Sequence, residues 1–273
     1  MKFMKLKQLI IFFALPLFLA GCGAPTESVQ VKITAPESAT STEITTETGR
    51  ETDDAGNGEE TGRQTEDVPA NQETAVEIPA ELELPVVFAS QAPLANWDDL
   101  HQEACEEASM IMAARYFAGE ALSQTIMEEE IQKLVAWEGD NGYDVDLTAE
   151  EAVMVLKDYF GQTARVETEA TVDRIKYELS LGNLIIVPAA GRELGNPYFR
   201  TPGPIYHMLV IKGYDRDEFI TNDVGTRRGD GFKYKYDQLL SAVHDWRPDL
   251  APDGMTEEEM SQGRKVLIVV ERP

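Results

Sequence analysis

The chain has 273 residues, of which 49 are Asp or Glu and 24 are Lys or Arg, so its formal net charge is −25. A charge of this sign and size argues against binding to nucleic acid or to anionic lipid surfaces, since both are polyanions. The two cysteines, Cys22 and Cys105, are too few for a disulfide framework within one chain.

The first 22 residues have the pattern of an export signal. Three lysines among the first seven residues precede an apolar run, residues 9–19, that is too short to span a membrane comfortably. The run ends Leu19-Ala20-Gly21-Cys22, which resembles the lipobox of bacterial lipoproteins. That resemblance implies cleavage before Cys22 and lipid modification of this cysteine. The alternatives are an ordinary signal peptide or a short N-terminal anchor helix.

Residues 23–83 are predicted to form a disordered acidic tether. The segment is rich in Thr and Glu and contains no Phe, Tyr or Trp. Such a composition cannot bury enough apolar surface to offset the entropy lost on ordering. A tether of ~60 residues spans on the order of 40–50 Å. We therefore expect a folded domain outside the cytoplasm, held in the bacterial cell envelope by a lipid anchor in either the inner or the outer membrane.

The folded domain is expected over residues 84–273, with its helices ahead of most of its strands. After a short strand over 84–88 and a polar loop over 90–102, apolar spacing predicts helices over 103–117, 123–137, 148–160 and 171–181. Thr148 and Glu151 form a capping box at the third helix, and Gly161 is a stop signal after it.

The second half of this domain reads as strands. They are predicted over 184–187, 207–214, 218–222, 231–234 and 265–270, with a short helix over 237–243. Helices first and antiparallel-type strands later predict an α+β fold, in which N-terminal helices pack on an antiparallel sheet.

Cys105 lies where the polar loop becomes a helix. Unpaired N–H groups and the helix dipole favour a thiolate at such a position, so Cys105 is a candidate nucleophile. The alternative is a small buried hydrophobic residue. The adjacent Glu106 and Glu107 are most simply acids that complement the dipole of the first turn, although they also raise the pKa of the thiol.

A histidine and an acid are predicted to meet at one end of a hairpin. His207 opens the strand over 207–214, and the turn 215–217 folds the next strand back beside it. Asn222 and Asp223 therefore lie next to His207, and side-chain alternation lets one of them face the imidazole. This arrangement supplies a base and an orienting acid for a cysteine nucleophile.

The ordered set of motifs resembles the C39-like peptidase family. The segments that carry the resemblance are Ser90-Gln91, Gln102-Glu103-Ala104-Cys105-Glu106-Glu107-Ala108, His207-Met208-Leu209-Val210-Ile211-Lys212-Gly213-Tyr214-Asp215 and Asn222-Asp223-Val224-Gly225-Thr226. The resemblance implies a papain-like fold with Cys105 as nucleophile, His207 as base and Asp223 as orienting acid. It departs from the family at Glu106, where many members have Gly.

The family also implies a glutamine that stabilises the oxyanion. Gln102 lies only three residues before Cys105, whereas Gln91 has the Ser-Gln context typical of the family. An oxyanion donor must point at the carbonyl position near the thiolate, and we favour Gln91 over Gln102.

No metal ion or other cofactor is expected. His101 lies four residues before Cys105, but no further Cys or His is nearby to complete a zinc site. The loop 140–146 with Glu151 has the outline of a calcium loop, yet Val145 stands at the sixth position, which demands Gly.

The sequence thus predicts a membrane-tethered, extracytoplasmic cysteine peptidase that cleaves peptide or protein substrates through an acyl-enzyme. We expect a monomer that does not bind nucleic acid. Two alternatives stay open: a catalytically inactive tethered module that binds peptides, and an acyl or amide transferase with the same triad.

Overall fold

The computed structural model describes residues 76–250 and 255–273. The predicted export signal, the proposed lipidation site Cys22 and most of the predicted tether lie outside these residues. Within the described ranges, no helix has the length and apolar character required to cross a membrane.

Seven strands of the described residues form one sheet, in which every pairing is antiparallel. Their order is β2-β7-β3-β4-β5-β6, and β1 also pairs with β4. The strands are β1 (Leu82–Glu83), β2 (Ala164–Glu167), β3 (Leu184–Ala190), β4 (Tyr206–Tyr214), β5 (Glu218–Asn222), β6 (Asp230–Lys235) and β7 (Leu267–Val270).

The two central strands, β3 and β4, are buried along their whole length because helices cover both faces of the sheet. Ile186, Met208 and Val210 pack in the core on one face. Their neighbours Leu209 and Ile211 pack in a second core on the other face. Burial on both faces explains why these strands are nearly continuous apolar runs rather than alternating patterns.

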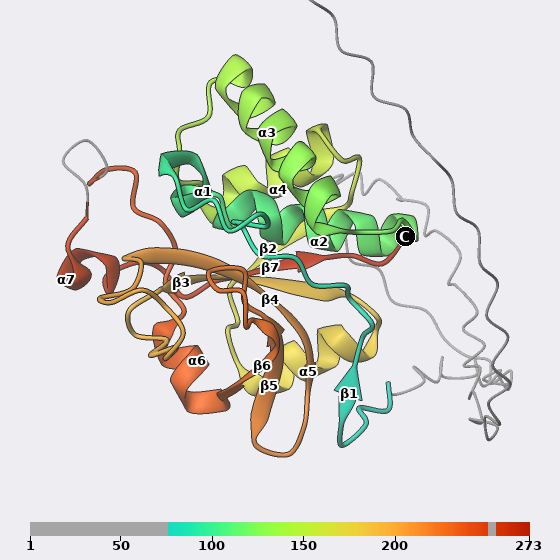
Figure 1. Ribbon diagram of the computed structural model, residues 1–273. Helices are drawn as coiled ribbons and strands as arrows, with labels where there is room; N and C mark the ends of the chain where they lie inside the picture. Colours follow the sequence, from blue (N-terminus) through green and yellow to red (C-terminus); the bar gives the residue numbers. More distant parts are fainter. Residues whose placement is uncertain (1–75, 251–254) are drawn as a thin grey trace, which may run out of the picture. The chain divides into compact units, whose positions relative to one another are not determined.

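The N-terminal helices cover one face of the sheet, and α5 and α6 cover the other (Figure 1). The first group is α1 (Asp99–Glu103), α2 (Cys105–Ala118), α3 (Gln124–Asn141) and α4 (Ala149–Asp158). The remaining helices are α5 (Val172–Ser180), α6 (Tyr236–Ala242) and the short α7 (Glu257–Met260). The predicted α+β fold, with N-terminal helices packed on an antiparallel sheet, is confirmed.

The predicted helix signals act where expected. The Thr148 and Glu151 capping box starts α4, and Gly161 follows that helix with a φ of +67°. Helix α3 is longer than predicted because it ends only at Gly142, which adopts the left-handed conformation with a φ of +82°. Residues 138–141, beyond the helix predicted over 123–137, are therefore helical as well.

The prediction of a strand over 84–88 is wrong. Leu82 and Glu83, at the end of the range predicted as tether, pair instead with Tyr214 and Gly213 as β1. Leu84 N adds one further hydrogen bond, to Lys212 O at 2.8 Å. The ladder ends there because β3 pairs with the same side of β4 at Ile211 and Val210, and Val86 N turns back to Leu84 O at 2.8 Å.

The approach to Cys105 also differs from the prediction. Part of the predicted loop over 90–102 forms α1, and the helix predicted from residue 103 is interrupted at Ala104 (φ −86°, ψ 32°). Cys105 is therefore the first residue of α2. Strand β2 and helix α7 were not predicted, since each has only four residues and neither presents a long periodic pattern.

Candidate active site

Cys105 begins α2 on the side of the sheet covered by the N-terminal helices. Ala104, the residue before it, offers no side-chain oxygen to the first N–H groups of the helix. Cys105 is buried, with 5% of the residue exposed. It donates a hydrogen bond to Glu106 Oε2 at 2.9 Å, and its Sγ accepts one from Met208 N at 3.3 Å. Sγ is thus held beside the backbone of β4.

The surroundings of Cys105 oppose formation of a thiolate in this state. Burial raises the pKa of the thiol well above its usual range, and the charge and hydrogen bond of Glu106 raise it further. The N–H of Met208 acts in the opposite direction but does not outweigh these effects. Position at a helix start is therefore not enough to activate Cys105.

His207 and Asp223 form a buried pair at the end of the β4–β5 hairpin. His207 Nε2 lies 2.8 Å from Asp223 Oδ1, and both side chains are almost completely buried. The register pairs Val210 with Asn222, so Asp223 is the first residue past β5 and reaches the start of β4. Asn222 points elsewhere and donates to Val86 O at 3.1 Å. The hairpin thus places the acid beside the imidazole, as the alternation predicted.

Two residues that the sequence analysis missed hold the second oxygen of Asp223. Its Oδ2 accepts hydrogen bonds from Asn196 Nδ2 at 2.8 Å and from Tyr234 OH at 2.5 Å. Burial raises the pKa of Asp223, but His207, Tyr234 and Asn196 together outweigh that effect and lower it below its ordinary value. Asp223 is therefore held as a carboxylate. No sequence motif points to Asn196, which lies in the loop after β3.

The imidazole of His207 is confined by its neighbours. The ring of Phe199 contacts it edge-on, with centroids 5.3 Å apart. On another side lies the backbone of Gly225, where an added Cβ would come within 2.8 Å of His207 Cε1. Asn196 and Phe199 also line a small pocket of about 120 Å³. The glycine in the Asn-Asp-x-Gly segment is thus explained by the close approach of the imidazole.

The Cys105 thiol lies beside the backbone of β4 next to His207, but the thiol and the imidazole are not bonded to each other. Sγ binds the N–H of Met208, the residue that follows His207. Met208 packs in the core with α2, whereas His207 packs against Phe199 of the other core. No hydrogen bond joins Cys105 to His207 in the part of the chain that the structure describes. The ring nitrogen of His207 that does not bind Asp223 is Nδ1.

Neither candidate glutamine binds Cys105. Gln91 is buried, and its amide nitrogen donates to His101 O and Gln102 O, both at 3.0 Å. Its Oε1 is buried and has no hydrogen-bond partner. The Gln102 amide is exposed and donates to Trp97 O at 3.5 Å. Gln91 therefore holds the carbonyl groups of α1, just before Cys105, and its role at an oxyanion stays a prediction.

The two glutamates after Cys105 are buried, contrary to the expectation of simple first-turn acids. Glu106 is completely inaccessible, and Glu107 is 4% exposed. Glu107 faces Glu138 of α3, and Asp146 lies close to both glutamates. Burial raises the pKa of Glu107 to about 7, that of Glu138 to about 10 and that of Asp146 to about 6. Cys105 thus borders a cluster of buried carboxyl groups whose pKa values are raised.

His101, the histidine considered above as a metal ligand, lies against two carboxyl groups instead. His101 Nδ1 lies 2.6 Å from Asp98 Oδ1, and its Nε2 lies 3.0 Å from Glu128 Oε2, so the ring joins the start of α1 to α3. Among the described residues, no group of three or more His, Cys, Asp or Glu side chains is arranged to hold a metal ion.

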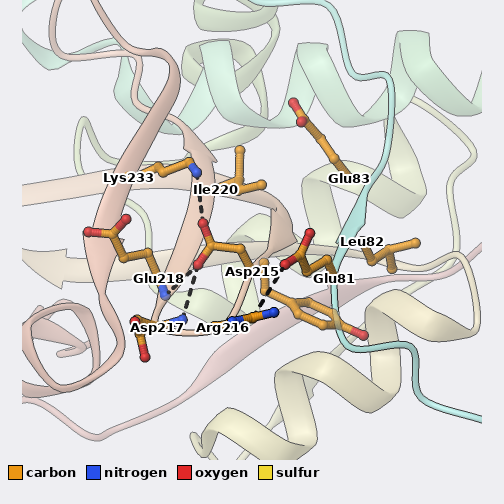
Figure 2. A pocket seen from close by; sticks show the side chains of 10 residues that line it. Glu81, Leu82, Glu83, Asp215, Arg216, Asp217, Glu218, Ile220 and Lys233 are labelled. Atoms are coloured by element: carbon orange, nitrogen blue, oxygen red, sulfur yellow. Dashed lines mark hydrogen bonds and ion pairs between the residues drawn. The ribbon is translucent and has the colours of Figure 1, made fainter.

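A larger pocket, of about 510 Å³, lies away from these residues between β1 and the β4–β5 turn (Figure 2). Its floor is fixed by Asp215, which accepts from Lys233 Nζ at 2.7 Å and from two backbone N–H groups of the turn. Glu81 and Glu83 form its opposite wall. None of its lining residues belongs to the Cys105, His207 and Asp223 group.

An α+β fold that brings a helix-start cysteine to the strand carrying a buried His–Asp pair is the arrangement expected of a cysteine-dependent hydrolase or a relative of one. Residues 83–248 match the model of the Peptidase_C39 like family, and the chain belongs to that family. The match covers His207, Asp223, Cys105 and both candidate glutamines.

Several solved structures match the chain, of which one is an example. A C39-like peptidase from Bacillus anthracis is 14% identical, with a TM-score of 0.44, and the alignment covers 71% of this chain and 98% of that one. No curated protein matches the chain.

Proposed function

We propose that this protein is a membrane-tethered, extracytoplasmic cysteine peptidase that uses Cys105, His207 and Asp223. The observation that carries the proposal is the buried pair of His207 and Asp223, whose Nε2 and Oδ1 atoms lie 2.8 Å apart. His207 lies on β4, and the N–H of the next residue in that strand, Met208, binds Cys105 Sγ. Membership of a C39-like peptidase family supports the reaction class. The lipobox ending in Cys22 supports the tether.

The reaction begins with transfer of the Cys105 thiol proton to Nδ1 of His207. Nε2 keeps its hydrogen towards Asp223, whose carboxylate stabilises the imidazolium. The thiolate attacks the carbonyl carbon of the peptide bond, and the carbonyl π electrons move to its oxygen. The intermediate collapses as the C–N bond breaks, and His207 gives its proton to the leaving amine. Water, deprotonated by His207, then hydrolyses the thioester and restores the Cys105 thiol.

The developing oxyanion needs donors beside Sγ. The first N–H groups of α2 are candidates, because no side chain caps this helix and they lie at its positive end. Gln91 is the other candidate. Its amide would have to leave the two carbonyl groups of α1 to which it now donates.

For catalysis the S–H hydrogen of Cys105 must turn from Glu106 towards His207. The bond to Glu106 and the raised pKa of the thiol favour a second candidate function, an inactive module that binds peptides without cleaving them. In that case the fold would supply only a peptide-binding surface.

Turnover of a peptide library by the purified folded chain separates the two functions. We expect the wild-type protein to cleave a subset of the peptides, and we expect Cys105→Ser and His207→Ala to lose this cleavage while they retain wild-type circular dichroism. If the wild-type protein binds peptides but leaves them uncut, and Cys105→Ser binds equally well, the peptidase proposal is wrong and the binding module stands.

A further inference from the structure

The polar side chain in contact with the proposed nucleophile is Glu106, the next residue in α2. Its Oε2 lies 2.9 Å from Cys105 Sγ, and its Oε1 accepts a hydrogen bond from Leu147 N at 3.3 Å. The side chain has no exposed surface. One carboxyl oxygen is thus fixed by the backbone before α4, and the other is aimed at the sulfur.

The groups that face Glu106 are mostly acids. They come from α2 (Cys105 and Glu107), α3 (Glu138), the loop before α4 (Asp146) and β4 (Tyr206, which also faces Asp245), while Glu103 of α1 acts on Glu107 and Asp146. No ion pair of the described residues involves Glu106. A buried carboxylate without a cation is costly, and a buried carboxyl group therefore keeps its proton. Burial, with Glu107 and Asp146 nearby, raises the pKa of Glu106 well above its ordinary value.

The protonation state of Glu106 decides its effect on the sulfur. An ionised Glu106 can only accept the thiol hydrogen, and its charge repels a thiolate. A neutral Glu106 has an O–H that can donate to a thiolate at the same distance. Cys105 and Glu106 therefore interact as a coupled pair, in which ionisation of one opposes ionisation of the other.

We propose that Glu106 is a catalytic residue that acts as a neutral carboxylic acid, whose O–H donates a hydrogen bond to the Cys105 thiolate. The inference rests on the proposed function, since it assigns a role beside the same nucleophile. The thiol proton moves to His207, and Glu106 keeps its own proton throughout. When the C–S bond forms, sulfur loses its negative charge and the hydrogen bond from Glu106 weakens. The Cys105 thiol regains a proton when the thioester is hydrolysed, so the pair shows no net change in protons over the complete cycle.

The test is the pH dependence of iodoacetamide alkylation of Cys105, followed by mass spectrometry of the peptide that contains it, so that Cys22 does not contribute. This readout does not require peptidase turnover, which is measured separately. Glu106→Gln keeps a neutral donor for sulfur and an acceptor for Leu147 N. Glu106→Ala removes both. Glu107→Gln is the matched control, since it removes a neighbouring buried carboxyl group that faces Glu138 rather than sulfur.

We expect Glu106→Gln to label at least as fast as the wild-type protein at pH 6 and to gain on it as pH rises, because ionisation of the wild-type carboxyl group repels the thiolate. Glu106→Ala should label about tenfold more slowly at pH 6, because a hydrogen bond to a charged group is worth about 1.5–3 kcal/mol. Glu107→Gln should stay closer to the wild-type profile than Glu106→Gln does, because Glu107 has no hydrogen bond to sulfur and acts on it only through its charge.

The proposal is overturned if Glu106→Gln labels as slowly as a folded Glu106→Ala, which would make Glu106 a base. It is also overturned if the Glu106→Gln profile has the same shape as the wild-type profile, a comparison that holds even when Glu106→Ala does not fold. If these labelling results agree with expectation but no peptide is cleaved, the role of Glu106 stands and the peptidase proposal fails.

Discussion

Asp223 is bound through both carboxylate oxygens, and this fixes the direction in which it faces His207. One oxygen meets the imidazole, while Tyr234 and Asn196 donate to the other. Because these donors stabilise the charged form, they keep the carboxylate ionised despite complete burial. In the proposed mechanism Tyr234 and Asn196 are therefore positioning residues, which act on His207 through Asp223.

Removal of the Tyr234 hydroxyl should weaken this arrangement. We expect Tyr234→Phe to lower kcat/KM about tenfold, since the lost hydrogen bond is to a charged group. The pKa of Asp223 is depressed in the folded protein, so its carboxylate is lost as pH falls through that value. Loss of a donor raises the pKa, and the acid limb of the kcat/KM profile should move to higher pH. Tyr236→Phe, which loses a hydroxyl bound to Asp215 O, is the control. An unmoved acid limb in Tyr234→Phe would contradict the assignment.

Gly225 gives a second prediction at this scale. A Cβ at this position would lie 2.8 Å from His207 Cε1 and 2.9 Å from Phe199 Cε1, so Gly225→Ala must displace the imidazole. A displacement of about 1 Å can reduce turnover about 100-fold. Gly139→Ala, in α3, meets no atom within 4 Å and should raise the melting temperature with unchanged turnover. Full activity in Gly225→Ala would show that His207 need not occupy this position.

At the level of elements, α2 and α3 meet through buried acids. Glu107 of α2 faces Glu138 of α3, and Asp146 lies in the loop that follows α3. Their pKa values of about 7, 10 and 6 exceed the ordinary values near 4, so the folded state holds protons that the unfolded chain releases. Packing of these helices is therefore linked to pH.

The domain should be most stable at mildly acidic pH. A carboxyl group whose pKa is raised by folding contributes its full stabilisation at pH values below its ordinary pKa. This contribution is lost as pH rises through the raised pKa. We expect the free energy of unfolding in urea to fall by a few kcal/mol between pH 5 and pH 8. Glu138→Gln should flatten this decline, whereas Glu129→Gln, an exposed position of α3, should not. Stability that is flat or rises over this range in the wild-type protein would refute the linkage.

Elements with strong local signals were predictable from the sequence. The Thr148 capping box, the β4–β5 hairpin and the apolar runs of β3 and β4 all appear where the patterns placed them. Segments fixed by distant partners were not. β1 depends on the free side of β4 at Gly213, and the turn at Ala104 that sets the start of α2 has no turn residue to mark it.

The same distinction applies to the site. His207 and Asp223 are sixteen residues apart and share one hairpin, so alternation alone brings them together. Asn196 and Tyr234 reach Asp223 only through the folding of the loop after β3 and of β6, and no local pattern reports this. Nor could the pattern show that Glu106 faces the thiol rather than solvent.

At the scale of the whole molecule, the proposed lipid anchor would place the folded domain at a membrane. Cys22 is the residue on which this depends. We expect Cys22→Ala to move the protein from the membrane fraction to the soluble fraction of its cells, because the mature chain then lacks the modified cysteine. Cys105→Ala, the other cysteine substitution, should leave the protein in the membrane fraction. Equal partitioning of Cys22→Ala and the wild-type protein would refute the lipoprotein assignment.

The central claim is that His207 activates Cys105. About a hundred residues separate the two in the sequence, and the contact between them runs through Met208 of β4, which follows His207 and binds the Cys105 sulfur. The most direct measurement is the rate of iodoacetamide alkylation of Cys105 at pH 6.5 in the wild-type protein and in His207→Ala. The account predicts labelling about tenfold or more faster in the wild-type protein, because the imidazolium stabilises the thiolate. Equal rates that rise only towards an ordinary thiol pKa of about 8.5 would contradict it.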